Sequence, residues 1–176
     1  MKIGKTKLEV YTGGIGKADA VAVVNPANDM LWTGGGISAV LRKEGGKTIE
    51  TEVMSKAPAA IGTAVLTGAG KLRYKRMIHA VISGQDLSTT EGNIRKAVRA
   101  SLEKADEVRC SSIAIPLLDS GSFDVEIHVA AKAIVDETVS YLLEHRTGLA
   151  RIVFVEHDRT MKGVFDTALH EKFTKH

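Results

Sequence analysis

The chain has 176 residues, of which 44% are hydrophobic and 26% charged, and its formal net charge is +3. This balance is typical of one soluble globular domain over residues 1–176, and the charge is too small to indicate a nucleic-acid-binding protein. Aromatic residues make up 5%, which argues against a platform for stacking many bases. Cys110 is the only cysteine, which excludes an intrachain disulfide and a cysteine metal cluster.

The N-terminus has no charged start followed by an apolar segment, and no apolar run is long enough to cross a bilayer. We therefore expect a cytoplasmic protein that makes no membrane contact. The sequence leaves the oligomeric state open.

Hydrophobic periodicity predicts strands that alternate with helices along the whole chain. Residues 1–11 alternate as a half-buried edge strand does, and the β-branched run 20–24 predicts a buried strand. Later strands are expected at residues 62–67, 77–82, 112–115 and 151–155. Helices are expected at residues 37–43, 47–55, 91–105, 127–142 and 161–169. Ser88 and Glu91 have the spacing of a capping box before the third helix.

This alternation predicts a three-layer α/β domain with a mostly parallel central sheet. Ligands of such sheets bind at the carboxyl ends of the strands. We therefore expect the loops that follow Val24, Ile115 and Val155 to lie together at one edge and to carry the site.

The first of these loops combines amides with glycines. Asn25 and Asn28 follow the predicted strand, and an amide both donates and accepts, as the hydroxyls of a sugar require. Gly34, Gly35 and Gly36 precede a helix, whose N-terminus favours an anion. The pattern indicates a socket for a sugar phosphate, and the alternative is a loop that needs glycine only for its turns.

The second loop has the same character. Ser120, Gly121, Ser122 and Phe123 offer hydroxyls, a glycine for close approach and a ring to cover a sugar. The alternative is a tight turn with the helix N-cap at Ser120 or Ser122.

Five segments together resemble the macro domain family, and they occur in the family's order. They are residues 23–28, 34–37, 62–67, 77–81 and 115–123. The resemblance implies a mixed α/β/α sandwich, with no cofactor, that binds ADP-ribose or an ADP-ribosylated small molecule or protein. Some family members only bind ADP-ribose groups. Others hydrolyse ADP-ribosyl esters, O-acetyl-ADP-ribose or ADP-ribose 1″-phosphate.

The resemblance also implies roles for single residues. Asn28 would reach the distal ribose and is the candidate catalytic residue. Asn25 is a ligand-binding candidate from the amide pattern alone. The glycine loop and Ile37 would give backbone contacts to the diphosphate and distal ribose. Ser120, Gly121 and Ser122 would close over the diphosphate, and Phe123 would pack on the distal ribose.

At the adenine end, Gly14 and Ile15 match a segment whose aspartate binds the adenine amino group, and Gly14 stands at the aspartate position. His157 stands where the family often presents an aromatic to adenine. The alternative is a loop histidine next to a helix cap at Asp158. Two further departures are Ser38, in place of a catalytic aspartate of one hydrolase branch, and Asp124, which we interpret as the N-cap of the long helix.

Other polar residues favour structural interpretations. His79 lies within an apolar strand and is expected to be a hydrogen-bonded core histidine. The histidines lack metal-ligand spacing, so no metal is expected. Trp32 would either shield the ligand or anchor its loop. The basic residues between Lys71 and Arg76 are expected to form a solvated turn.

Three functions remain open. The first is a module that only binds ADP-ribose. The second is an enzyme that acts at the distal ribose, an ADP-ribosyl hydrolase or ADP-ribose 1″-phosphate phosphatase. The third, less favoured, is a binder of single-stranded RNA or poly(A).

Overall fold

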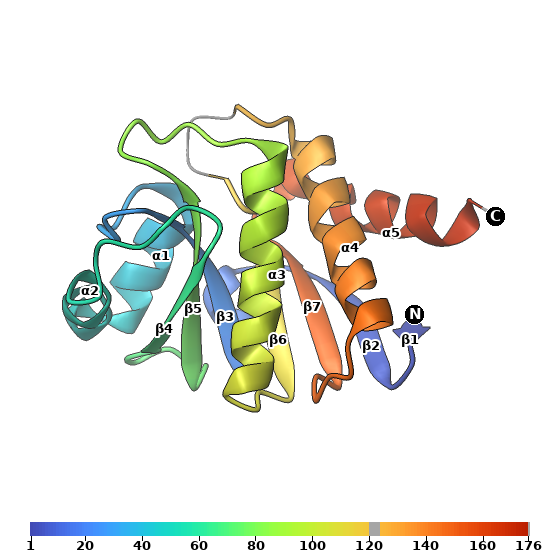
Figure 1. Ribbon diagram of the computed structural model, residues 1–176, viewed down its shortest axis with the longest axis horizontal. Coiled ribbons are helices and arrows are strands. Elements are labelled where there is room, and N and C mark those ends of the chain that lie inside the picture. The colour runs from blue at the N-terminus through green and yellow to red at the C-terminus, as the bar shows by residue number, and fades with distance from the viewer. Residues whose placement is uncertain (120–123, 176) are drawn as a thin grey trace.

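In the computed structural model, which describes residues 1–119 and 124–175, seven strands form one sheet in the order β1-β2-β7-β6-β3-β5-β4 (Figure 1). The strands are β1 (Lys2–Ile3), β2 (Thr6–Thr12), β3 (Ala22–Asn28), β4 (Ala64–Gly68), β5 (Arg76–Ser83), β6 (Ser112–Pro116) and β7 (Arg151–Glu156). The five inner strands run parallel, and β1 and β4 pair antiparallel at the two edges. The mixed, mostly parallel sheet predicted from the sequence is confirmed.

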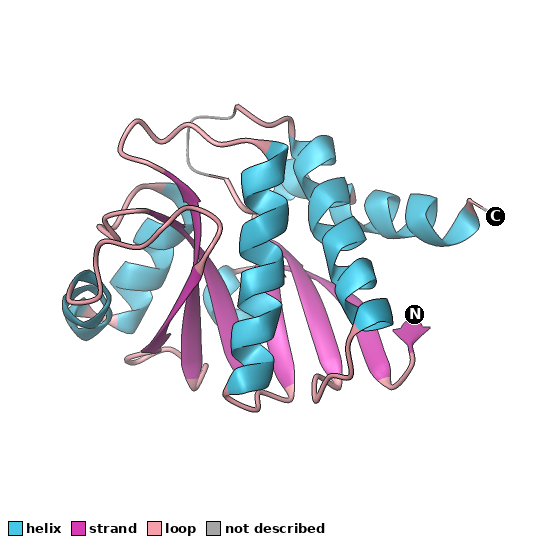
Figure 2. Cartoon of the chain, viewed as in Figure 1, coloured by secondary structure: helices cyan, strands magenta, loops and turns pink. Residues whose placement is uncertain are grey.

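Helices cover both faces of this sheet, which makes the three-layer sandwich (Figure 2). They are α1 (Gly36–Gly45), α2 (Lys47–Met54), α3 (Glu91–Glu107), α4 (Ile127–Glu144) and α5 (Val164–Thr174), with short 3-10 turns η1 (Ile15–Lys17) and η2 (Arg159–Met161). Helices α3 and α4 lie in front of the sheet in Figure 1, and α1 and α2 lie behind it. No helix in the described ranges is both long and apolar enough to span a membrane.

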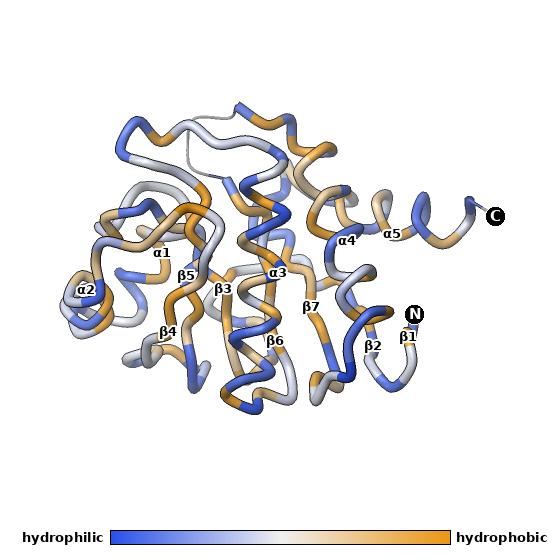
Figure 3. Tube along the Cα trace, in the orientation of Figure 1, coloured by the Kyte–Doolittle hydropathy of each residue, from blue (hydrophilic) through white to orange (hydrophobic). Residues whose placement is uncertain are grey.

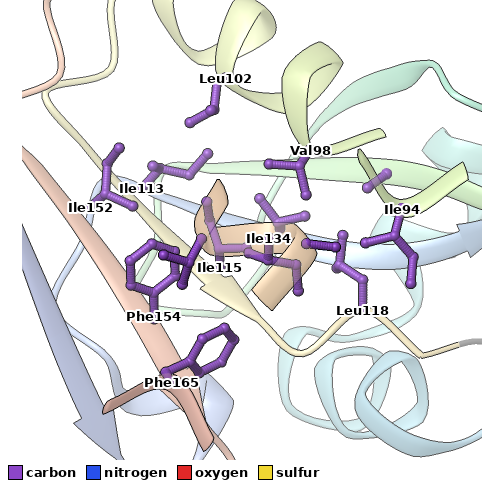
Figure 4. Close-up of a cluster of buried hydrophobic side chains, with 14 of the residues drawn as sticks. Ile94, Val98, Leu102, Ile113, Ile115, Leu118, Ile134, Ile152, Phe154 and Phe165 are labelled. Atoms are coloured by element: carbon purple, nitrogen blue, oxygen red, sulfur yellow. The ribbon is translucent and has the colours of Figure 1, made fainter. Parts of the chain in front are cut away.

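Successive strand residues point to opposite faces, and this builds two cores from the same strands. On the face of α3, α4 and α5, Ile113, Ile115 and Phe154 are buried (Figure 4). On the face of α1 and α2, the intervening Ala114 and Val153 are buried instead. Figure 3 shows the same concentration of hydrophobic residues along the strands. Because the inner strands are buried on both faces, their sequences are continuous runs of apolar residues.

Two predicted strands have different bounds in the structure. Residues 1–11 do not form one strand, because the chain turns at Gly4, whose φ is +57°, and pairs β1 with β2. Strand β3 continues past Val24 to Asn28, so both asparagines lie inside the strand and not after it. Met161, expected in the last helix, lies in η2.

Helix α3 is capped by Thr90, and the prediction that Ser88 and Glu91 form a capping box is wrong. The Thr90 side chain accepts a hydrogen bond from Asn93 N at 3.1 Å, whereas Ser88 Oγ donates to Asp86. Since local spacing offers several Ser and Thr residues, the backbone path into the helix decides which of them is the cap.

We expect Thr90→Ala to lower the free energy of unfolding by about 1 kcal/mol, because one N–H of the first helical turn loses its acceptor. Ser88→Ala is the matched control, with an expected change below about 0.5 kcal/mol at this exposed position. Urea denaturation of both variants measures the difference, and equal losses would contradict the assignment of the cap.

Candidate functional site

Five loops meet at the carboxyl edge of the parallel strands, at the top of Figure 1. They follow β2, β3, β5, β6 and β7, and they include the three loops expected from the sequence. The turn before β5, which carries the basic residues between Lys71 and Arg76, lies at the opposite edge. All four basic side chains of that turn are exposed, as predicted.

Pro26 helps to open this edge. Strand β6 pairs with β3 only at Ala22 and Val23, whereas β5 pairs along the whole of β3. Proline has no N–H to donate to a neighbouring strand, and beyond Val23 the β6 side of β3 needs none. The two strands therefore separate here, and a crevice forms between them.

Two connected pockets occupy the crevice. The Asn28 pocket is lined by Pro26, Ala27, Asn28, Trp32, Gly34, Gly35, Ser38, Ser83, Leu87 and Asp119. The His157 pocket is lined by Gly35, Gly36, Ile37, Val40, Leu117, Asp119, His157, Asp158 and Met161. Its volume is about 490 Å³, within the range of small-molecule sites. Gly35 and Asp119 line both pockets, which therefore adjoin each other, and the Asn28 pocket is much the smaller, at about 20 Å³.

The N-terminus of α1 lies at the junction of the pockets. Gly35 is its N-cap and brings no side chain, and Gly36 begins the helix with a φ of +60°. The first N–H groups of the helix have no partner within the helix, and the helix dipole places partial positive charge beside them. This arrangement suits an anionic group that spans the junction.

Asn28 is 4% exposed and braces the loop that follows it. Its Nδ2 donates to Trp32 O at 2.9 Å, and its Oδ1 accepts from Met30 N at 3.1 Å. Trp32 Nε1 in turn donates to Gln85 Oε1 at 2.6 Å, which ties this loop to the loop after β5. An amide nitrogen has a second proton and a carbonyl oxygen a second lone pair, so Asn28 retains capacity for a ligand. Its catalytic assignment stays a prediction.

Asn25 points to the other face of the sheet, into a small cavity that we call the His79 cavity. Asn25, Ser38 and His79 are among the residues that line it. Asn25 Nδ2 lies 3.1 Å from His79 Nδ1, and His79 Nε2 lies 2.8 Å from Thr67 Oγ1. The Thr67 hydroxyl donates to Gly68 O, so His79 Nε2 carries the proton and Nδ1 accepts from Asn25. The ligand role of Asn25 stays a prediction.

His79 is the core histidine expected from the sequence. It is 2% exposed, and burial lowers its pKa to about 3, with a smaller contribution from Lys56. The ring is therefore neutral at pH 7, and its two nitrogens hold Asn25 and Thr67 in place. In the described ranges, no three His, Cys, Asp or Glu side chains group as a metal site.

His157 links the loop after β7 to η1. Ile15 N donates to His157 Nδ1 at 3.0 Å, and Gly14 is the N-cap of η1. Glu156, 1% exposed, precedes His157 and accepts from Gly163 N, Phe165 N and Thr12 Oγ1. These bonds fix the position of the loop. Asp158 accepts from Thr160 N and caps the short turn η2, whereas the N-cap of the last helix, α5, is Gly163.

Residues 120–123, which carry the predicted contacts of Ser120, Gly121, Ser122 and Phe123, lie outside the described residues. The alternative of an N-cap at Ser120 or Ser122 also falls on these residues. The interpretation of Asp124 as the N-cap of α4 is wrong. Glu126 caps this helix through bonds from His128 N and Val129 N. Asp124 Oδ2 instead accepts from Thr89 N at 3.0 Å, which joins the loops after β5 and β6.

The pockets also contain residues that the sequence reasoning did not select. Asp119 lines both pockets, and Val40, Leu117 and Met161 line the His157 pocket. Asp119 carried a local signal, because it follows the end of the buried strand β6 by three residues. The apolar residues carried none, because core residues have the same periodicity.

Comparisons with known proteins agree with this fold. The Macro domain family model matches residues 24–134. An uncharacterized protein of Aquifex aeolicus is 37% identical over 163 residues, covering 92% of this chain and 97% of that protein. One from Sulfolobus acidocaldarius is 33% identical over 168 residues, covering 90% of each. The chain therefore belongs to the macro domain family.

Solved structures show the same fold. A macrodomain from Oceanobacillus iheyensis, a mutant with ADPR, has a TM-score of 0.87 at 22% identity, covering 99% of this chain and 98% of that one. A Trypanosoma brucei macrodomain in complex with ADP-ribose has a TM-score of 0.83 at 22% identity, covering 92% of this chain and 68% of that one.

Proposed function

We propose that this protein binds ADP-ribose, either free or attached to another molecule, across the two connected pockets. The observation that carries the proposal is the glycine-capped N-terminus of α1 at the junction of the pockets. The diphosphate lies there, over Gly35 and Gly36. Family membership and the ligands named for the Oceanobacillus and Trypanosoma macrodomains support the same ligand.

The two ends of the ligand then fall into different surroundings. The Asn28 pocket presents the Asn28 amide and the Ser38 and Ser83 hydroxyls, which suit the hydroxyls of the distal ribose. The His157 pocket presents Ile37, Val40 and Met161, which suit the flat apolar faces of a base.

Calorimetric titration with ADP-ribose, AMP and ribose 5-phosphate tests this proposal. We expect ADP-ribose to bind at least about 100-fold more tightly than either fragment, because only the whole molecule reaches both pockets and anchors the diphosphate between them. Equal affinities for ADP-ribose and AMP would contradict the use of the Asn28 pocket.

Asp119 favours a second, more specific function, hydrolysis at the distal ribose. Its carboxylate lines the Asn28 pocket together with Asn28 and Ser38. A carboxylate can accept the proton of an attacking water, whereas Ser38 cannot do so without a base of its own. The candidate substrates are ADP-ribosyl esters, O-acetyl-ADP-ribose and ADP-ribose 1″-phosphate.

Turnover of these three substrates by Asp119→Asn distinguishes an enzyme from a binding module. In an enzyme that uses Asp119 as base, the rate falls by about 100-fold or more, with ADP-ribose affinity within threefold of wild type. Turnover that survives the substitution removes Asp119 from the mechanism, and no turnover by wild type leaves a binding module for these substrates.

A further inference from the structure

The hydrogen bond between Ile15 and His157 determines the protonation of the histidine ring. A backbone N–H can only donate, so His157 Nδ1, 3.0 Å from Ile15 N, must accept. An imidazole that accepts at Nδ1 carries its proton on Nε2. Ile15 is fully buried, so its N–H is held in place on one side of the ring.

The two nitrogens of an imidazole point in different directions, so Nε2–H points away from Ile15. The ring lines the His157 pocket beside Met161 and Val40. Gly14, next to Ile15, brings no side chain to this end.

We propose that His157 recognises the base of the ligand as a hydrogen-bond donor, through Nε2–H. This inference deepens the proposed function, on which it rests, by stating which feature of the base is recognised. A donor pairs with a ring nitrogen or a carbonyl of a purine and makes no use of an exocyclic amine. The site therefore accepts adenine and hypoxanthine alike, because both offer acceptors on the purine ring.

Asp158 is the competing group at this end of the pocket. Asp158 also lines the His157 pocket, and its Oδ1 accepts from Thr160 N at 3.0 Å. An acceptor at this place would pair with the amino group of adenine and would repel the carbonyl oxygen of hypoxanthine. Recognition by His157 predicts equal binding of adenine and hypoxanthine, whereas recognition by Asp158 predicts a preference for adenine. A comparison of one adenine ligand with its hypoxanthine analogue distinguishes the two.

The test is calorimetric titration with ADP-ribose and with its hypoxanthine analogue, IDP-ribose. We expect wild-type Kd values within about threefold of each other. His157→Phe keeps a ring in the pocket and removes the hydrogen-bond donor. It should raise the Kd of both ligands by about fivefold, which corresponds to the loss of one neutral hydrogen bond. His157→Gln, which can accept from Ile15 and donate to the base, should recover part of the loss.

Asp158→Asn is the matched variant, since its amide oxygen can still accept from Thr160 N. We expect it to leave the ratio of the two Kd values unchanged. A wild-type preference for ADP-ribose above about 20-fold, or a ratio that moves with Asp158→Asn and not with His157→Phe, would overturn the proposal. Failure of both ligands to bind would overturn the proposed function and this inference together.

Discussion

Gly35→Glu is expected to weaken ADP-ribose binding by at least about 100-fold without lowering the thermal midpoint of unfolding. Gly35 has an ordinary φ of −84°, and a Cβ atom added there meets no atom of the described residues within 4 Å. The backbone therefore accepts a side chain without strain. The new carboxylate would lie at the junction of the two pockets, against the N-terminus of α1, where the diphosphate is proposed to bind.

Stability should be preserved for the same reason that binding is lost. A carboxylate at a helix N-terminus is favourable by about 0.3–1 kcal/mol, because it faces unpaired N–H groups. In Gly35→Glu the new carboxylate occupies the N-terminus of α1. The two phosphates of ADP-ribose would then bind next to a negative charge, which repels them. Gly36 would be a poorer choice, because its φ of +60° makes any side chain costly there.

Gly92→Glu is the control, because it makes the same change of charge in the first turn of α3, away from both pockets. An added Cβ there comes no closer than 3.8 Å to a neighbour, the Thr90 hydroxyl. Titration of both variants with ADP-ribose should show loss only in Gly35→Glu. If Gly35→Glu binds within threefold of wild type, the ligand does not cross Gly35.

The fold could be predicted because apolar residues repeat with a different spacing in the helices than in the strands. The apolar run of β7 and the helical stripe of α3 are local signals, and alternation of the two kinds of element defines the sandwich. The end of β3 could not be predicted in this way. Proline usually ends a central strand. Pro26 can lie inside β3 because pairing between β3 and β6 already stops at Val23.

Part of the candidate site could be predicted because glycines and amides after a strand are local features as well. Contacts between distant residues could not. Ile15 and His157 are 142 positions apart, and Asp124 reaches Thr89 across 35 positions. By composition Asp124 is the better N-cap, and only its tertiary contact with Thr89 explains why Glu126 caps the helix instead.

The buried ring of His79 should make stability strongly dependent on pH. Burial holds the pKa of His79 at about 3 in the folded protein, against 6.5 for an exposed histidine. Above pH 6.5 the ring is neutral in both the folded and unfolded states, and His79 adds no pH dependence. Below pH 6.5 the unfolded chain binds a proton that the folded protein does not, so stability falls as the pH falls.

The slope from one proton is about 1.4 kcal/mol per pH unit, so this residue alone should cost about 5 kcal/mol between pH 6.5 and 3. Urea denaturation at several pH values from 7 to 4.5 measures the slope. His79→Gln can still accept from Asn25 and donate to Thr67, and it should reduce the slope by that amount. His170→Gln, at an exposed position, should leave the slope as it is in wild type. Equal slopes in wild type and His79→Gln would show that His79 takes up its proton in the folded protein, which its position between Asn25 and Thr67 opposes.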